Sequence, residues 1–193
     1  MLQVVVPRSA IMAGTDIVKK LIAADVQWIR LTGKFSEDEL RPVTELCSEA
    51  GIILVLDDDV ELVEKSRIHG VHLTDWDRGK VISVREELGP HAIVGVTCTD
   101  PGLLKDLNGL DVDYTVFPLP SDRNPGEYYH EVIDSLSKIK TELHPVASGC
   151  FSSDELHVIL SEGVQGIEAA SCITEAPDPE FAARHLLGLI SNS

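Results

Sequence analysis

Residues 51–77 read GIILVLDDDVELVEKSRIHGVHLTDWD, and this stretch decides the fold. It holds two short, almost continuously apolar runs, residues 52–56 and 70–73, which are typical of strands buried on both faces. The segment between the two runs has the amphipathic pattern of a helix. A strand, a helix and a second strand in this order predict a unit whose two strands are parallel.

The same unit recurs on both sides of this stretch. Amphipathic segments with apolar residues at helical spacing, such as Ile17, Leu21 and Ile22, separate the apolar runs. Helix starts are marked at Ser36 and Ser152, because each serine is followed by an acidic first turn. The further runs with strand character are residues 2–7, 26–31, 92–97, 112–117, 145–148 and 166–171.

Eight strand–helix units fill the 193 residues at about 24 residues each, which is near the lower limit for such a repeat. We therefore predict an α/β fold, a small (β/α)8 TIM barrel that residues 1–193 form as a single domain. An open, doubly wound sheet is the alternative. Its best signature, a GxGxxG motif after the first strand, is absent from the sequence.

Composition limits the partners of the chain. Lys and Arg number 16 and Asp and Glu number 32, so the net charge is −16. Nucleic acids and anionic membranes need a basic surface, so we expect neither as a partner, whereas small phosphorylated ligands remain compatible. The four cysteines form no CxxC pair, which favours free thiols in a reducing compartment. Without a signal-peptide pattern or a membrane-length apolar run, we expect a cytoplasmic protein.

Acidic residues follow the third and fourth predicted strands. Asp57, Asp58 and Asp59 come directly after the third strand, and Asp75 and Asp77 come after the fourth. Adjacent strand ends lie close together in a barrel, so one carboxylate from each makes an oxygen site suited to Mg²⁺. The alternative is that these acids cap helices, which is common for structural reasons alone.

Basic residues mark the end of the second predicted strand. Arg30 alternates with Trp28 and Thr32, so all three side chains should point into the barrel, and Lys34 lies just beyond. An inward arginine in a barrel mouth needs an anion. That anion is either a ligand or a carboxylate of Asp57 or Asp58, and both interactions can hold at once.

Small and polar residues follow the seventh and eighth predicted strands. Ser148 and Gly149 end the seventh, and Ser171 and Cys172 end the eighth. Barrels often bind phosphate with the loops at these two strands, where a glycine lets backbone approach the ligand closely. An ordinary tight turn is the alternative.

The histidines and cysteines suggest no catalytic pair. His72 lies within the fourth predicted strand, and we expect it to be a packed core residue. Cys98, Cys150 and Cys172 all follow strand ends, which would let them cluster at the barrel mouth. We expect small buried thiols there in preference to a redox centre.

The stretch 51–77 resembles the corresponding segment of the thiamine-phosphate synthase superfamily, which includes a thiazole tautomerase branch. The likeness extends, in the family's order, to VQWIRLTGK, IVGVTCTD, DYTVFP, PVASGCFSSDEL and GIEAASCI, and so covers nearly the whole chain. It independently implies the small (β/α)8 barrel.

The resemblance also implies an activity. The synthase joins hydroxymethylpyrimidine diphosphate to a thiazole phosphate with release of pyrophosphate, by a displacement that depends on Mg²⁺ and basic groups. By position, Arg30 would contact the pyrophosphate, Asp58 and Asp77 would bind Mg²⁺, Thr97 would replace a serine that contacts the diphosphate, and Gly149 and Ser171 would hold the thiazole phosphate.

Several positions depart from the family's pattern and reduce the number of basic residues that would contact the diphosphate. Asp57 stands for an asparagine of the substrate site, and Thr32 for a basic residue that Lys34 could replace. Ser121 and Arg123 are the residues that could substitute for a threonine and a lysine after the sixth strand. The remaining departures are Asp59 for an arginine, Thr99 for a histidine that looks catalytic in the tautomerase branch, and Cys150 for a second glycine.

Three hypotheses follow from this pattern. The first is a divergent thiamine-phosphate synthase acting with Mg²⁺ on phosphorylated small molecules. The second is a paralogous, Mg²⁺-dependent barrel for another phosphorylated small molecule. The third is a catalytically inactive barrel that binds a phosphorylated ligand. A homodimer is compatible with each of them.

Overall fold

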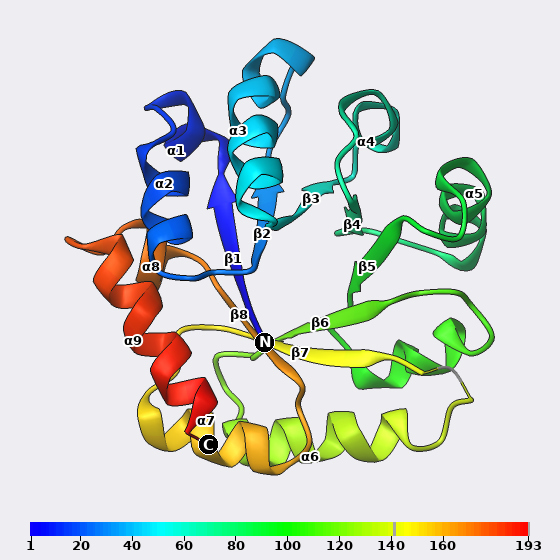
Figure 1. Cartoon of the computed structure of the whole chain (residues 1–193). Helices are drawn as coiled ribbons and strands as arrows, with labels where there is room; N and C mark the ends of the chain where they lie inside the picture. The colour runs from blue at the N-terminus through cyan, green and yellow to red at the C-terminus, as the bar shows by residue number, and fades with distance from the viewer. Residues whose placement is uncertain (141, 193) are drawn as a thin grey trace.

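The structure is a computed structural model, and it describes residues 1–140 and 142–192. Within these residues, eight parallel strands close into a barrel in sequence order, with the last strand paired to the first. Figure 1 shows the strands at the centre and the helices around them. The strands are β1 (Leu2–Pro7), β2 (Trp28–Thr32), β3 (Ile53–Asp57), β4 (Gly70–Leu73), β5 (Ile93–Thr97), β6 (Tyr114–Pro118), β7 (His144–Ser148) and β8 (Gly166–Ala169). The predicted (β/α)8 barrel is confirmed, and the alternative of an open sheet is wrong.

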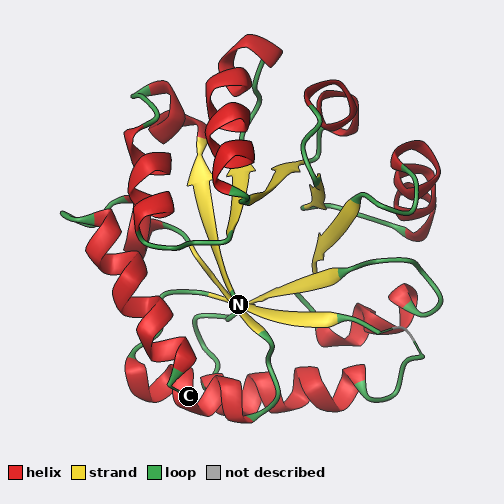
Figure 2. Ribbon diagram, viewed as in Figure 1, coloured by secondary structure: helices red, strands yellow, loops and turns green. Residues whose placement is uncertain are grey.

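Helices form a ring outside the strands, as the colouring in Figure 2 shows. The predicted helix starts at Ser36 and Ser152 are confirmed. Each serine accepts a hydrogen bond from the backbone N–H three residues on, and the glutamate there bonds back to the serine N–H. The helices are α1 (Arg8–Met12), α2 (Asp16–Ala23), α3 (Glu37–Ala50), α4 (Val60–Ser66), α5 (Arg78–Leu88), α6 (Pro125–Leu136), α7 (Ser153–Ser161), α8 (Ser171–Thr174) and α9 (Pro179–Ser191). No helix of the described chain has the length and apolar character that crossing a membrane requires.

The fifth crossover differs from the predicted strand–helix repeat, because it is the 3₁₀ helix η1 (Pro101–Leu107). Asp100 caps it by accepting from the Gly102 N–H at 2.8 Å. Gly109 follows with φ of 78°, a left-handed conformation that ends helical structure. The segment between Pro101 and Gly109 therefore forms one short helical piece, here of the 3₁₀ kind.

Strand side chains alternate between two interiors. Those that face outward pack against the helices in one large apolar core. Those that face into the barrel form a small apolar cluster around Tyr114, Val116 and Val146. Other inward side chains are polar although they are buried, which is costly unless they are paired. These are Gln3, Arg30, Asp57, His72 and Glu168.

Candidate active site

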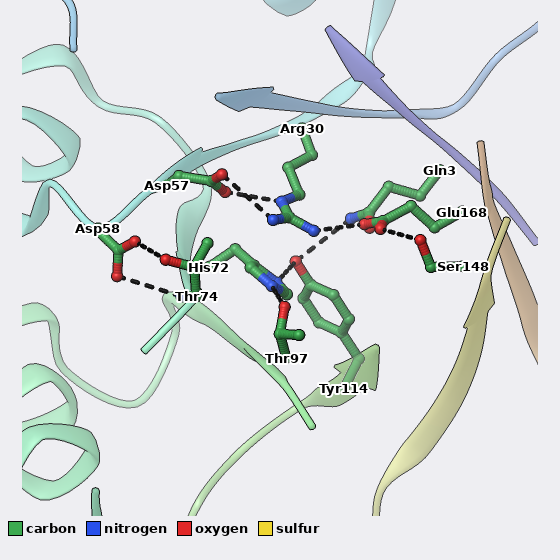
Figure 3. A network of polar contacts seen from close by, with 10 residues as sticks. All are labelled: Gln3, Arg30, Asp57, Asp58, His72, Thr74, Thr97, Tyr114, Ser148 and Glu168. Atoms are coloured by element: carbon green, nitrogen blue, oxygen red, sulfur yellow. Dashed lines mark hydrogen bonds and ion pairs between the residues drawn. The ribbon is translucent and has the colours of Figure 1, made fainter. Parts of the chain in front are cut away.

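A buried ion-pair cluster joins β2, β3 and β8 inside the barrel (Figure 3). Arg30 Nε and Nη2 donate to Asp57 Oδ1 and Oδ2 at 2.7 and 3.2 Å, and Arg30 Nη1 donates to Glu168 Oε2 at 2.6 Å. Ser148 Oγ donates to the other oxygen of Glu168 at 2.8 Å. The sequence offered Asp57 or Asp58 as the carboxylate that pairs with Arg30, and the structure shows that it is Asp57, in a bidentate ion pair.

The charges in this cluster do not cancel. Burial opposes a charged guanidinium, but Glu168 and Asp57 outweigh it and raise the pKa of Arg30 above its ordinary value. Both carboxylates accept hydrogen bonds from their neighbours in the cluster. One positive and two negative charges leave the cluster with a net charge of −1. Its contacts use three of the five N–H groups of Arg30.

Glu168 is the functional candidate that the sequence analysis missed. Its side chain is 6% exposed in the middle of β8. The signal was a lone acidic residue inside the apolar run GIEAAS. A charge in a strand that is buried on both faces needs a buried partner, and Arg30 was the candidate.

A second network of hydrogen bonds begins at His72, which lies in β4 and is fully buried. Its Nδ1 lies 2.9 Å from Tyr114 Oη, and its Nε2 lies 2.7 Å from Thr97 Oγ1 (Figure 3). The Tyr114 ring has room because β5 carries Gly95 opposite it, where a Cβ would lie 2.1 Å from the ring. His72 is thus a core residue, as predicted, but it connects the interior to a strand end.

The direction of these hydrogen bonds follows from their neighbours. Gln3 satisfies its surroundings when its amide nitrogen donates to Glu168 Oε2 at 2.7 Å and its oxygen accepts from Trp28 Nε1 at 2.8 Å. In this orientation the Tyr114 hydroxyl has two acceptors, the Gln3 oxygen at 3.3 Å and His72 Nδ1 at 2.9 Å, and we assign its hydrogen to the nearer one, His72. His72 Nε2–H donates in turn to Thr97, which leaves the Thr97 hydroxyl hydrogen free for a ligand.

Burial of His72 makes folding stability depend on pH. Desolvation, and then the charge of Arg30, lower the pKa of His72 well below its ordinary value of 6.5. Below pH 6.5 the unfolded chain therefore binds a proton that the folded chain does not. We expect the free energy of unfolding to fall with decreasing pH there, by up to about 1.4 kcal/mol per pH unit from this group.

Urea denaturation between pH 7.5 and 5 measures this effect, roughly the range in which histidine changes charge. His72→Gln should flatten the pH dependence. His157→Gln, on the exposed face of α7, is the matched control and should leave it unchanged. Equal slopes in the wild type and His72→Gln would contradict the assignment.

Asp58 lies at the end of β3 with backbone φ of 52°, in the left-handed region that few residues other than glycine, asparagine and aspartate adopt. Its N–H donates to His72 O at 3.0 Å. Its carboxylate accepts from both the N–H and the hydroxyl of Thr74, and from Lys80 Nζ at 3.2 Å. Asp58 is therefore held firmly at the barrel mouth.

Asp59 and Asp77 cap helices, which was the alternative to metal binding that the sequence left open. Asp59 accepts from the Leu62 N–H of α4 at 3.1 Å, and Asp77 accepts from the Lys80 N–H of α5 at 2.8 Å. In residues 1–140 and 142–192, no three His, Cys, Asp or Glu side chains are grouped as metal ligands.

The donor set nevertheless fits Mg²⁺ in one particular form. Asp58 and Asp77 both contact Lys80, one at its ammonium group and the other at its backbone N–H. Mg²⁺ commonly takes one or two carboxylates and completes its shell with water and phosphate oxygens. Lys80 Nζ holds Asp58 in this structure, so a metal ion bound by Asp58 and Asp77 would take the place of this ammonium group, and water or a phosphorylated ligand would complete its shell.

A cavity of about 530 Å³ opens beside the ends of β4 and β5. Thr97 and Asp77 both line it. Trp76 forms part of its wall and is fixed by donating from Nε1 to Thr97 O at 2.8 Å. Thr97, whose hydroxyl bonds to His72, and Asp77, one of the two candidate metal ligands, thus line the same cavity.

A model of the thiamine monophosphate synthase family matches residues 2–173 of this chain, which include every strand of the barrel. The chain belongs to this family. A thiamine-phosphate synthase of Halorhodospira halophila is 32% identical over 155 residues, with 78% of this chain and 73% of the relative covered. One of Vibrio campbellii is 26% identical over 185 residues, covering 90% and 89%.

The fold agrees with this family. A thiamine phosphate pyrophosphorylase from Pyrococcus furiosus superposes with a TM-score of 0.80, covering 99% of this chain and 95% of the other. At 19% identity, this likeness concerns the fold alone. The resemblance inferred from the sequence is confirmed.

The basic residues predicted to supplement the family's clamp do not reach the buried cluster. Lys34 is exposed in the loop after β2. Arg123 donates to Glu131 Oε2 at 2.7 Å and lies over the Tyr128 ring, 5.5 Å from its centre. Ser121 is exposed in the same loop. Both cations belong to the outer rim of the barrel mouth.

The loops after β7 and β8 are tied together. Gly149 N–H donates to Glu168 O at 3.1 Å, and a Cβ at Gly149 would lie 2.7 Å from the Phe151 ring. Gly149 therefore has a role in packing, and its role near a phosphate stays a prediction. Ser171 begins α8 and is exposed.

The expectation of buried thiols at the strand ends is confirmed for Cys98 and is wrong for Cys150 and Cys172. Cys47 and Cys98 are buried, whereas Cys150 and Cys172 are exposed. The exposed thiols follow the neighbouring strands β7 and β8 and line a cavity together with residues of α9.

Proposed function

We propose that this chain is a thiamine-phosphate synthase-like transferase, which joins hydroxymethylpyrimidine diphosphate to thiazole phosphate and releases pyrophosphate. The observation that carries the proposal is the family match over residues 2–173, together with relatives named thiamine-phosphate synthase that this chain spans for most of their length. The polar groups at the barrel mouth support it, because each has a use in this reaction.

The diphosphate would lie in the cavity beside β4 and β5. The free hydroxyl hydrogen of Thr97 would donate to a phosphate oxygen, and Arg30 has two N–H groups beyond its ion pairs. Asp58 and Asp77 would hold Mg²⁺. When bound, this ion neutralises charge on the leaving pyrophosphate. Three aspartates and one arginine, Arg78, line the cavity, so its lining has a net negative charge and a diphosphate would enter together with its metal ion.

The buried ion-pair cluster would act on the pyrimidine. In a dissociative displacement the pyrimidine gains positive charge before the new bond forms. The net charge of −1 shared by Arg30, Asp57 and Glu168 would stabilise that charge. Ser148 already holds Glu168 in place, so little reorganisation is needed at the moment of reaction.

The thiazole phosphate would lie at the loops after β7 and β8. Ser171 offers an exposed hydroxyl there, with Cys172 beside it, and Gly149 adds no side chain to obstruct the ligand. Barrels of this kind frequently hold phosphate at these loops. The two substrates would thus approach the centre of the barrel mouth from opposite sides.

Tyr114→Phe tests the chain of hydrogen bonds that ends at Thr97. Without its hydroxyl, His72 Nδ1 loses its donor, and Thr97 is no longer held as a donor to phosphate. We expect KM for the diphosphate substrate to rise about tenfold, the effect of one hydrogen bond, with a smaller change in kcat.

Tyr129→Phe is the matched control for this variant. Tyr129 is also buried, but its hydroxyl donates to Phe117 O at 2.8 Å. Steady-state kinetics should therefore separate the two variants. A shared rise in KM, or none in Tyr114→Phe, would refute the role given to Thr97.

One observation favours a second candidate function. Arg123 is paired with Glu131 and Lys34 lies at the rim, so the cationic clamp for a diphosphate is incomplete in this conformation. This suits a paralogous barrel for another phosphorylated small molecule, or a barrel that binds without turnover.

The experiment that separates these functions mixes purified protein, Mg²⁺ and both substrates, and quantifies thiamine phosphate against a control without protein. Product supports the synthase. Binding of thiazole phosphate without product favours the inactive barrel. Folded protein that neither forms product nor binds thiazole phosphate favours the paralogue.

A further inference from the structure

Two exposed thiols meet at the ends of neighbouring strands. Strands β7 and β8 are paired in parallel, with Ser148 opposite Glu168, and the Gly149 N–H bonds to Glu168 O just beyond. Cys150 follows this bond directly, and Cys172 is the second residue of α8. Both thiols line one cavity of about 460 Å³ beneath the loops, and their side chains interact with each other.

We infer that Cys150 and Cys172 form a reversible disulfide, so that this pair is a site of oxidative modification by low-molecular-weight disulfides. Cys150 lies two residues beyond the end of β7 and Cys172 lies three residues beyond the end of β8, so the pairing of these strands brings both cysteines to the same part of the barrel mouth. Thiols that interact and share one cavity need little backbone movement to bond.

The exchange would proceed in two steps. The Cys150 thiolate attacks one sulfur of the small disulfide, which forms a mixed disulfide and releases one small thiol. Cys172 then loses its proton and attacks the Cys150 sulfur, which closes the protein disulfide and releases the second small thiol. Two protein thiols are oxidised while one small disulfide is reduced to two thiols, so the electrons and protons balance.

The order of attack follows from burial. Desolvation, followed by the interaction with Cys150, raises the pKa of Cys172 to about 11. Its thiolate is therefore scarce at neutral pH although both thiols are exposed, so we assign the first attack to Cys150.

The other two cysteines provide internal controls. Cys47 and Cys98 are buried, and desolvation raises the pKa of each thiol to about 11. Cys98 Sγ also contacts Asp100 O at 3.1 Å. Because burial keeps a small disulfide away from both thiols, both should stay reduced in the folded protein, whereas Cys172 has a similarly raised pKa but is exposed.

The disulfide would restrain the loops after β7 and β8, which are proposed to hold the thiazole phosphate, so this consequence rests on the proposed function. Gly149 and Ser171 directly precede the two cysteines. A covalent bond there would fix the spacing of the loops, and we expect KM for thiazole phosphate to rise several-fold in the oxidised protein.

The test treats the full chain with oxidised glutathione and maps the products by peptide mass spectrometry. We expect a peptide that links Cys150 to Cys172, a mass lower by two hydrogen atoms, and full reversal by a reducing agent. Cys172→Ser should instead keep a stable glutathione adduct on Cys150. Separate adducts on the two cysteines without a link, or a link that includes Cys47 or Cys98, would overturn the inference.

The wild-type mapping decides the question even if a serine variant fails to fold. If the oxidised protein has an unchanged KM for thiazole phosphate, the disulfide forms but does not alter the function of the loops. A reduced protein that forms no thiamine phosphate would instead count against the proposed function, because disulfide formation does not depend on turnover.

Discussion

Replacement of Arg30 by leucine is expected to lower the free energy of unfolding by about 3–5 kcal/mol. The Arg30 side chain is 9% exposed, and it is the cation between Asp57 and Glu168. Leucine would leave these two carboxylates buried together without compensation, which costs far more than the pair itself contributes. Urea denaturation at pH 7 measures the change.

Two controls separate charge from packing in this experiment. Arg123→Leu also breaks an arginine–glutamate pair, but an exposed one, so its unfolding midpoint should stay close to that of the wild type. Adding Asp57→Asn and Glu168→Gln to Arg30→Leu should recover much of the lost stability, because no buried charge remains. An Arg30→Leu variant as stable as the wild type would contradict the buried cluster.

Asp58→Asn is expected to lower kcat/KM about 100-fold and to raise the Mg²⁺ concentration needed for half-maximal activity. Loss of one carboxylate ligand removes roughly 3 kcal/mol of the stabilisation that the metal gives to the leaving group. Asparagine tolerates the left-handed backbone at this position and still accepts from Thr74, so the fold should persist.

The neighbouring Asp59→Asn is a matched control for Asp58→Asn. It removes the same charge one residue away, and asparagine still caps α4. Magnesium titrations of activity should therefore distinguish the two variants. Equal dependence on Mg²⁺ in Asp58→Asn and the wild type would exclude Asp58 as a metal ligand.

The barrel could be predicted because its signals are local. Each apolar run, such as residues 52–56, is too short and too continuous to be anything but a buried strand, and helix caps such as Ser36 mark the crossovers. The fifth crossover could not be predicted as 3₁₀, because Pro101 is also compatible with the first turn of an α-helix. Only the nearby Gly109 limits its length.

The site was predicted less completely, because it depends on contacts across the barrel. Alternation along β2 places Arg30 inward, and the acid at the end of β3 is its neighbour, so the Arg30–Asp57 pair follows from sequence. Contacts from His72 to Tyr114 and to Thr97 span 42 and 25 residues. They depend on the stagger between strands, which no local pattern encodes.

The most direct test of the proposed transferase follows both phosphorus-containing products by phosphorus NMR. Purified chain is mixed with Mg²⁺, hydroxymethylpyrimidine diphosphate and thiazole phosphate, and each substrate is omitted in turn. We expect pyrophosphate and thiamine phosphate to form in equal amounts, only when both substrates are present, and far more slowly with Asp58→Asn. Protein that unfolds cooperatively in urea, and is thus folded, yet forms neither product would contradict the proposed function.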